Sequence, residues 1–533
     1  MIVGVVLSRS TNKVAGSATV HSVIPVLSSS PPSRAFRGMR AVSTIITTII
    51  TETIGSVHSA ALRSTLINEH RLISLNTDPP PPPNAKRRFD FNTNSRLFAA
   101  GKGWANGRLM NALMALLLVT SYAASALIVM KLQIYEGPNF SITKNETGLT
   151  APPIIVFGLS LFLQGVISSF GAYHCGPYWL ENTDMLATTK KQVDDHIIYS
   201  RPHRCMHNVQ SNTPDPLTTP DPLTVPYPLE PSARQPSAWS ASPTVKKAVV
   251  VVWGLIPVYT IWGAIIYALS VYVSTRSSKS GDIQSVGIGS AKLPDFSWAF
   301  VPNNNTQAFG VAYLTTHAKE EASLPSAAWP SILLVFMAIQ SGLTLSLHYC
   351  EAIINTTRDE DLWRQAVGDK GASTLEKRFP ISPIAGALGS WRSVFLSATK
   401  FFCHWLFGLS FQVSGQFAGF NFIGMEVITY CAQIWYLSAV LIGFAIITTL
   451  IANYKPRGPQ PAAYGHFQTL ADLVDEWHDV VYWGHKSESE KSGVCHAGTS
   501  SDKSLLLNTV QMDSMYGGEL DPKWPPTVNM QSV

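Results

Sequence analysis

Charged side chains are scarce in this chain of 533 residues. Aspartate, glutamate, lysine and arginine make up 14% of it, whereas soluble globular proteins carry about 25%. The deficit arises in long apolar stretches with almost no internal charge, because an ionised side chain in lipid is costly unless it is paired. This composition excludes an ordinary soluble protein. The net charge of +5 comes from basic residues beside the apolar stretches, so it indicates no nucleic-acid partner.

Enzyme signatures are absent as well. The chain has no GxSxG elbow, Walker loop, HExxH or CxxC motif. It also lacks a pair of intramembrane aspartates for proteolysis and an arginine-rich helix for voltage sensing. We therefore expect no enzyme activity, no catalytic residues and no cofactor.

Six apolar stretches dominate what is present. A helix needs about 20 apolar residues to cross the hydrocarbon core of a bilayer, and each stretch meets that requirement. We therefore predict an all-α membrane protein, a bundle of about six transmembrane helices within residues 108–455. The predicted spans are 109–130, 153–173, 248–273, 330–350, 394–414 and 427–452.

The basic residues beside these spans predict the topology. With a cytoplasmic N-terminus, eighteen Lys and Arg flank the spans on the inside and six on the outside, a bias that places both termini in the cytosol. Three N-x-[ST] sequons, at Asn139, Asn145 and Asn304, then fall in outside loops and predict glycosylation in the secretory pathway (plasma membrane, vacuole or endoplasmic reticulum). The six cysteines lie in spans or on the cytoplasmic side, which excludes a disulfide-stapled ectodomain.

The segments outside the spans are mostly predicted to be disordered. Residues 1–107, a cytoplasmic N-terminal region, contain no convincing span, because the Ile/Thr-rich run Thr44–Ile54 is too short. A basic, acid-poor start is also typical of a mitochondrial transit peptide, and this alternative stays open. Pro79–Pro83 and the proline-rich loop between the second and third spans are candidate docking segments for cytosolic proteins. By contrast, Gly415–Glu426 predicts a tight hairpin between the last two spans.

The chain beyond the last span carries one ordered element. Residues 456–486 comprise a proline-rich exit and an amphipathic helix over Phe467–Trp483, in which apolar residues recur at i, i+3, i+4 and i+7. The opposite face is acidic, so we expect the apolar stripe to pack on protein, such as the second and fourth loops, rather than on lipid. Residues 487–533 are predicted to be a disordered tail. The stripe, a candidate partner-binding surface, consists of Leu470, Leu473, Val474, Trp477 and Val481.

Few groups in the predicted spans offer chemistry. None contains Asp or Glu, which disfavours ion-coupled transport, and Lys400 is expected to snorkel toward the surface. The alternating His203, Cys205 and His207 lack the second ligand pair of a structural zinc site, so no metal site is predicted. For His404, a proton-linked role and a hydrogen-bonded packing role both stay open. The intramembrane polar candidates are Gln164, Gln340, His404 and Gln433.

Six short runs in the C-terminal third form a pattern. They are HWLFGL from His404, KPRGPQPA from Lys455, GHFQTLADLVDEW from Gly465, WGHK from Trp483, HAGTS from His496 and VQMD from Val510. Over about residues 400–515 this pattern resembles a group of fungal multi-pass membrane proteins without known function. The resemblance implies no activity, cofactor or substrate. It does imply that residues 455–486 form a defined cytoplasmic element.

Two function classes fit the sequence. The first is a non-enzymatic membrane scaffold or sensor that engages cytosolic partners through the proline-rich segments and the C-terminal helix. The second is a channel or passive transporter for a small solute, lined by the intramembrane polar candidates. The large share of motif-like cytoplasmic sequence favours the first class.

Overall fold

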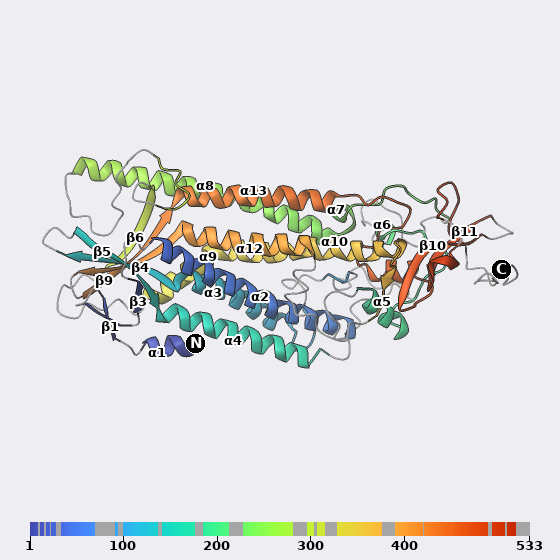
Figure 1. The fold of residues 1–533 in the computed structure, drawn as a ribbon, viewed down its shortest axis with the longest axis horizontal. Helices are drawn as coiled ribbons and strands as arrows, with labels where there is room; N and C mark the ends of the chain where they lie inside the picture. The colour runs from blue at the N-terminus through green and yellow to red at the C-terminus, as the bar shows by residue number, and fades with distance from the viewer. Residues whose placement is uncertain are drawn as a thin grey trace.

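The structure is a computed structural model, and its described residues form an elongated molecule (Figure 1). A helical bundle carries a β-sheet at one end and a smaller unit at the other. The described residues are 1–8, 11–14, 18–21, 23–27, 33–69, 91–93, 100–136, 141–175, 185–212, 228–280, 296–302, 306–314, 328–375, 390–418, 421–488, 493–506 and 509–518.

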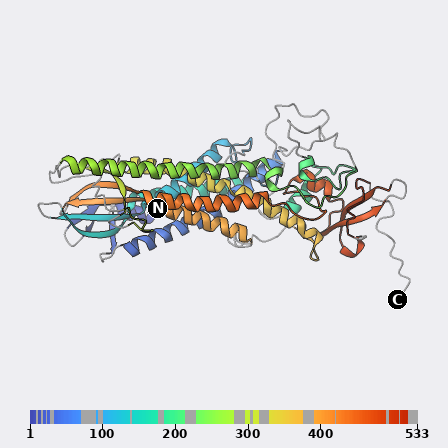
Figure 2. The same cartoon turned by 90° about the horizontal axis from the view of Figure 1, so that it is seen from above.

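Long helices run side by side along the axis of the bundle (Figure 2). Within the described residues, six helices are long and apolar enough to cross a membrane, and five of these correspond to predicted spans. The five are α3 (Arg108–Leu127), α4 (Ala151–Tyr173), α8 (Pro243–Ser280), α9 (Ala328–Tyr349) with its continuation α10 (Glu351–Arg364), and α13 (Cys431–Asn453). The predicted span 394–414 falls on α12 (Trp391–Ser410), which packs in the bundle but is not among the six.

Helix α2 (Ser33–Asn68) is the main departure from the expected fold. We expected no span in residues 1–107, yet Arg37–Ile67 is long and apolar enough to cross a membrane. Its threonines lower the hydropathy of the sequence but are satisfied locally. The hydroxyls of Thr44, Thr48 and Thr51 each donate to the carbonyl four residues earlier, at 2.8–2.9 Å. Such bonds hide the polar group inside the helix.

A six-stranded sheet covers one end of the bundle, so the fold is not purely α-helical. Its strand order is β3-β5-β4-β8-β9-β6. One hairpin, β4–β5, joins α3 to α4, and another, β8–β9, joins α12 to α13. The predicted hairpin at Gly415–Glu426 is confirmed as the β-hairpin β8–β9, whose strands extend beyond these residues on both sides. The strands are β3 (Val23–Leu27), β4 (Val129–Glu136), β5 (Ser141–Thr150), β6 (Ala308–Leu314), β8 (Phe411–Ala418) and β9 (Asn421–Tyr430).

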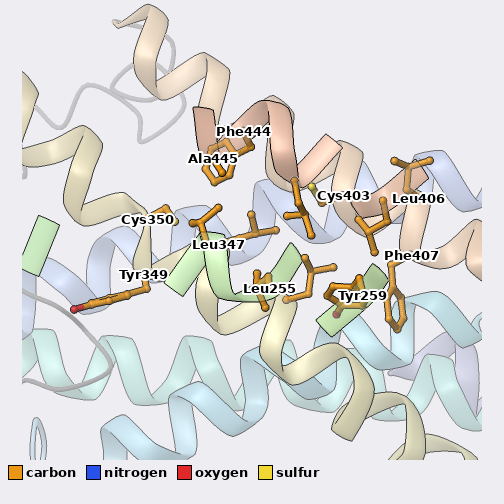
Figure 3. Close-up of a cluster of buried hydrophobic side chains, with 14 of the residues drawn as sticks. Leu255, Tyr259, Leu347, Tyr349, Cys350, Cys403, Leu406, Phe407, Phe444 and Ala445 are labelled. Carbon is orange, nitrogen blue, oxygen red and sulfur yellow. The ribbon is translucent and has the colours of Figure 1, made fainter. Parts of the chain in front are cut away.

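The bundle core lies where α8, α9, α12 and α13 meet (Figure 3). Leu347 and Phe407 are fully buried there. Outside it, large apolar side chains face away from the protein, among them Phe162 (62% exposed) and Leu450 (67% exposed). A broad apolar surface on helices of this length is suited to lipid.

A second unit, which we call the C-terminal unit, lies at the end of the bundle opposite the six-stranded sheet (Figure 1). It contains a three-stranded sheet of order β11-β10-β7 and two short helices. Its elements are α5 (Met185–Asp194), β7 (Ala372–Ser373), α14 (Phe467–Leu473), β10 (Val480–Glu488) and β11 (Cys495–Ser500). The other short elements of the chain are α1 (Ile2–Ser8), β1 (Thr11–Val14), β2 (Ala18–His21), α6 (Val209–Asn212), α7 (Ala238–Ala241) and the 3-10 turns Gln365–Val367 and Lys503–Leu505.

The C-terminal unit corrects two expectations and confirms one. The amphipathic helix predicted over Phe467–Trp483 ends at Leu473, and the chain then forms strand β10. The tail predicted to be disordered contributes β11, and Tyr516 pairs with Leu229. The apolar stripe does pack on the second and fourth loops, in one core with residues such as Met185 and Ala372.

The two ends of the chain lie toward opposite ends of the bundle (Figure 1). Helix α2 adds one passage along the bundle, so α1 lies at the start of α4, where the isoleucine side chain of Ile155 contacts Gly4. The C-terminal unit lies at the other end. The placement of both termini on one side of a membrane stays a prediction, which α2 makes worth testing because it adds a candidate span at the N-terminal end.

Candidate functional site: a buried ion cluster

A buried lysine holds two carboxylates in the middle of the bundle. Lys400 of α12 is 1% exposed, and its Nζ lies 2.7 Å from Oε1 of Glu52 in α2 and 2.6 Å from Oε1 of Glu351 in α10. A buried ammonium is tolerated only when it is paired and hydrogen-bonded. The expectation that Lys400 snorkels to the surface is wrong, because its charge ends inside the protein.

His348, near the end of α9, completes what we call the ion cluster: Glu52, His348, Glu351 and Lys400. Its Nδ1 lies 2.9 Å from Oε1 of Glu351 and 3.3 Å from Nζ of Lys400. The shorter contact is satisfied when Nδ1 carries a hydrogen and donates to Glu351, which leaves Nε2 as the basic nitrogen. With His348 neutral, one ammonium and two carboxylates give the cluster a net negative charge. A proton on Nε2 would cancel that charge.

The ion cluster lies about midway along the bundle. Toward the sheet end, Arg40 of α2 donates to the carbonyls of Ala126 (2.7 Å) and Gly408, where α3 and α12 end. Glu52 lies twelve residues beyond Arg40, about 18 Å at 1.5 Å per residue. In the other direction, Arg392 at the start of α12 lies eight residues from Lys400, about 12 Å. If the bundle crosses a bilayer, the cluster is therefore deep within the apolar core.

Aromatic and amide groups cover the ion cluster on the side of the sheet. The ring of Tyr122 in α3 stacks on that of His404, with centroids 3.8 Å apart. The hydroxyl of Tyr122 lies 3.2 Å from the hydroxyl of Thr51, the residue before Glu52 on α2. Nε2 of Gln340 in α9 lies 3.1 Å from Nδ1 of His404. Two of the four intramembrane polar candidates, Gln340 and His404, thus meet beside the cluster.

The break between α9 and α10 positions two members of the cluster. Cys350 separates the helices, with His348 just before it and Glu351 in the first turn after it. The break therefore presents an imidazole and a carboxylate to Lys400 from a single chain segment.

The donor set also matches that of a metal site. One atom each from Glu52, His348 and Glu351 lies within 4.8 Å of the others, and carboxylate and imidazole ligands suit divalent transition metals. The ammonium of Lys400, however, occupies the position between the carboxylates that a cation would take. A metal ion would have to displace it, so the geometry suits a proton better than a metal ion.

Helix α10 connects the ion cluster to the C-terminal unit. Nine residues after Glu351, Oε2 of Glu360 accepts hydrogen bonds from the backbone N–H of Ala463 (2.9 Å) and of the residue after it. Nε1 of Trp363 donates to the carbonyl of Pro461 (2.9 Å), and the indole is fully buried in the core of the C-terminal unit. A shift of α10 would therefore reach this unit directly.

Helix α2 makes a second connection from Glu52. Further along it, Nη1 of Arg63 donates to Oδ1 of Asn92 (2.8 Å), and Nδ2 of Asn92 donates to Oδ2 of Asp359 in α10 (3.0 Å). Ile67 then packs in a small cluster with the first residue of α14. Both glutamates of the ion cluster thus lie on helices that reach the C-terminal unit.

Several histidines of the C-terminal unit are held away from titration near neutral pH. Burial, with the charge of Arg201 close by, lowers the pKa of His466 to about 3 and that of His207 to about 4. For His496, burial alone would lower the pKa, but the hydrogen bond to Asp475 (3.0 Å) raises it to about 10. These three side chains keep their charge between about pH 5 and 8.

The other polar candidates lie elsewhere in the bundle. Gln164 donates to the carbonyl of Leu117 (3.1 Å) and to Ser121 Oγ (3.3 Å), which ties α4 to α3. Gln433 donates to the carbonyl of Ala299 (2.9 Å) at the sheet end. These are packing contacts, and the four candidates do not gather around one path.

The remaining candidates separate into described and undescribed residues. Asn145 lies in β5 at the sheet end, whereas Asn139 and Asn304 lie outside the described residues, as do Pro79–Pro83. The residues of the candidate partner-binding stripe form part of the core of the C-terminal unit. All of them except Trp477 are fully buried there. In the histidine–cysteine run, Nδ1 of His203 lies 2.7 Å from the carbonyl oxygen of Gly517, and Cys205 belongs to that core.

Sequence reasoning missed three of the four cluster residues. His348 lies at the end of the predicted span 330–350, Glu351 lies just beyond it, and Glu52 lies in a region predicted to be disordered. One signal was available: Glu52 is the first acidic residue of the chain and lies within the Ile/Thr-rich run Thr44–Ile54. A lone acid inside an apolar run is a candidate for an intramembrane partner of Lys400.

The fold and the ion cluster define a class rather than a family. The length and hydropathy of the helices are those of a multi-pass membrane protein, with ionisable groups buried in its bundle. No protein-family model, curated protein or solved structure matches the chain.

Proposed function

We propose that the protein is a non-enzymatic membrane sensor, in which a proton binds His348 and the change is transmitted to the C-terminal unit. The observation that carries this proposal is the ammonium of Lys400, which is shared by carboxylates on two helices, α2 and α10. Both helices also reach the C-terminal unit. Ionisable groups inside a membrane bundle are costly and generally mark functional sites.

The switching step follows from the charges of the ion cluster. A proton on Nε2 of His348 creates a second cation whose Nδ1 is 3.3 Å from the ammonium of Lys400. The imidazolium binds Glu351 more strongly than neutral imidazole does, and it repels Lys400 toward Glu52. The link between α12 and α10 weakens, and α10 moves relative to the C-terminal unit. Tyr122 and His404 are the other titratable groups beside His348.

The scaffold alternative within the first function class, and the second class, have less support. A scaffold would need the apolar stripe of the C-terminal unit, but that stripe is already buried within the chain. A passive conduit would need the four intramembrane candidates on one path, and only Gln340 and His404 meet. Location in the secretory pathway, glycosylation, docking through the proline-rich segments and membership in the fungal group stay predictions.

Hydrogen exchange of the full chain in lipid nanodiscs tests the sensor. We expect amide protection in residues 455–486 to differ severalfold between about pH 5 and about pH 7.5, because burial and the nearby ammonium of Lys400 oppose a second positive charge on His348 until the pH is low. In His348→Gln, this pH dependence should disappear while the fold stays intact, because Gln340, His404 and the glutamates remain. Thermal unfolding of the variant reports whether the fold is kept.

The matched control is His478→Gln in the C-terminal unit. His478 is 39% exposed and pairs with Glu476 (3.2 Å), so its loss should leave the pH response as in the wild type. If His348→Gln keeps the full response, or if the wild type shows none, the sensor proposal is wrong.

A further inference from the structure

The ion cluster lies at one end of a seam between α9 and α12. On α9, Phe336, Gln340, Thr344 and His348 recur every four residues, so they follow one face of the helix. All four are buried. This seam is polar over the half nearer the ion cluster and aromatic over the half nearer the sheet.

Helix α12 presents a matching face. Lys400 meets His348, with nitrogen atoms 3.3 Å apart, and His404 meets Gln340 at 3.1 Å. Closer to the sheet, Phe407 lies against Phe336, with ring centroids 6.4 Å apart. The order of contacts along both helices is thus ion cluster, amide–imidazole pair, aromatic rings.

Four buried polar atoms line the polar half of the seam without a hydrogen-bond partner in the part of the chain that the structure describes. They are Oε1 of Gln340, Oγ1 of Thr344, Nε2 of His348 and Nε2 of His404. Buried polar atoms are nearly always hydrogen-bonded, and a buried water molecule needs two to four polar partners. A row of such atoms, on two facing helices, is suited to a file of water molecules that ends at the basic nitrogen of His348.

Three phenylalanines close the seam toward the sheet. Phe336, Phe407 and Phe411 are at most 2% exposed. The ring centroids of Phe407 and Phe411 are 4.6 Å apart, and Phe336 lies 6.0 Å from Phe411. A dry aromatic constriction of this kind blocks a water file without blocking the packing of the helices.

We propose that the seam between α9 and α12 is a proton path from the sheet side to His348, and that Phe336, Phe407 and Phe411 form its gate. This inference rests on the proposed sensor function and names the route of its ligand. When the gate opens, a hydronium ion in the file transfers its proton to Nε2 of His348. The nitrogen lone pair forms the new N–H bond, one O–H bond breaks, and a water molecule and an imidazolium remain.

Proton flux through the full chain in liposomes, with a pH-sensitive dye inside, tests the path. A proton on His348 can pass on to Glu351 and Glu52, whose side chains are 16% and 25% exposed, and so leave the bundle beyond the gate. Replacing two gate rings, in Phe336→Ala with Phe411→Ala, should speed dye acidification at least severalfold after an external acid pulse. Adding Gln340→Leu and Thr344→Val to that variant should return the rate close to that of the wild type. If the double variant is not recovered as a folded protein, Phe336→Leu provides the same comparison with less loss of packing.

The control is Phe395→Ala on α12, which removes a ring that packs on Phe444 of α13, with centroids 5.7 Å apart, rather than in the seam. It should leak no faster than the wild type. A gate variant that leaks no faster than Phe395→Ala, or a leak that persists after Gln340→Leu and Thr344→Val, overturns the path. A pH response of the C-terminal unit without any leak overturns the path alone, whereas a leak without that response overturns the sensor proposal alone.

Discussion

Lys400 sets the electrostatics of the bundle interior. Its ammonium is the positive charge that pairs with Glu52 and Glu351, with Nζ–O distances of 2.7 and 2.6 Å. Without it, two carboxylates would face each other in a medium that screens charge poorly. The stability of the bundle should therefore depend on this one side chain more than on any exposed ion pair.

Lys400→Met should destabilise the protein by about 2–4 kcal/mol, because it leaves two partly buried carboxylates without their positive partner. Adding Glu351→Gln should recover much of that loss, since it removes one of the two negative charges. Thermal unfolding in detergent measures both. Lys503→Met is the matched control: its partner is the exposed Asp369, and its effect should be within about 0.5 kcal/mol. A Lys400→Met protein as stable as this control would contradict the ion cluster.

The elements show how far the sequence predicts this fold. Hydropathy located most of the bundle because lipid demands long apolar helices. It missed α2 because the Ile/Thr-rich run Thr44–Ile54 is too short to span on its own, whereas the helix extends from Ser33 to Asn68. The ion cluster was missed partly for that reason, because Glu52, one of the two acidic partners of Lys400, lies on α2.

In the C-terminal unit, the spacing of apolar residues predicted correctly which side chains are buried, but it predicted a helix where the chain forms a strand. The apolar positions from Leu470 to Val481 are mostly buried, as their spacing indicated. The helix ends, however, because Asp475 takes its hydrogen bonds from β11, including the N–H of Thr499 (2.6 Å) and Nε2 of His496 (3.0 Å). The tertiary hydrogen bonds of this one carboxylate outweigh the local preference of the sequence for a helix.

The pair of His496 and Asp475 predicts how the stability of the C-terminal unit depends on pH. The folded-state pKa of His496 is raised from 6.5 to about 10. Its contribution is therefore fully present below about pH 6.5 and is lost as the pH rises through about 10. Although burial opposes it, the hydrogen bond from His496 and the charge of Lys486 lower the pKa of Asp475 to about 2, so that contribution is present above about pH 4 and is lost as the pH falls toward about 2.

His496→Gln should therefore destabilise the C-terminal unit at neutral pH by about 2 kcal/mol, the size of a hydrogen bond to a charged group. The difference from the wild type should shrink above about pH 10. Denaturant unfolding followed by hydrogen exchange of residues 480–500 measures it. An equal difference at about pH 7 and about pH 11 would mean that His496 stabilises the unit without its charge.

At the scale of the whole molecule, the account depends on the path of α2. This helix joins the sheet end, where Arg40 binds the last carbonyls of α3 and α12, to the C-terminal unit, where Ile67 packs. Glu52, near the middle of this helix, pairs with Lys400. If α2 crosses the membrane with the other helices, the two ends of the chain face opposite sides.

Protease protection of two epitope tags, one before Met1 and one after Val533, tests this claim most directly. In sealed microsomes with the cytosolic face outward, we expect the C-terminal tag to be digested and the N-terminal tag to survive until detergent is added. This expectation rests on the basic residues that flank the helices at the end that carries the C-terminal unit, a bias that favours the cytosol. Digestion of both tags without detergent would mean that α2 does not cross, and that Glu52 does not reach Lys400 inside the membrane.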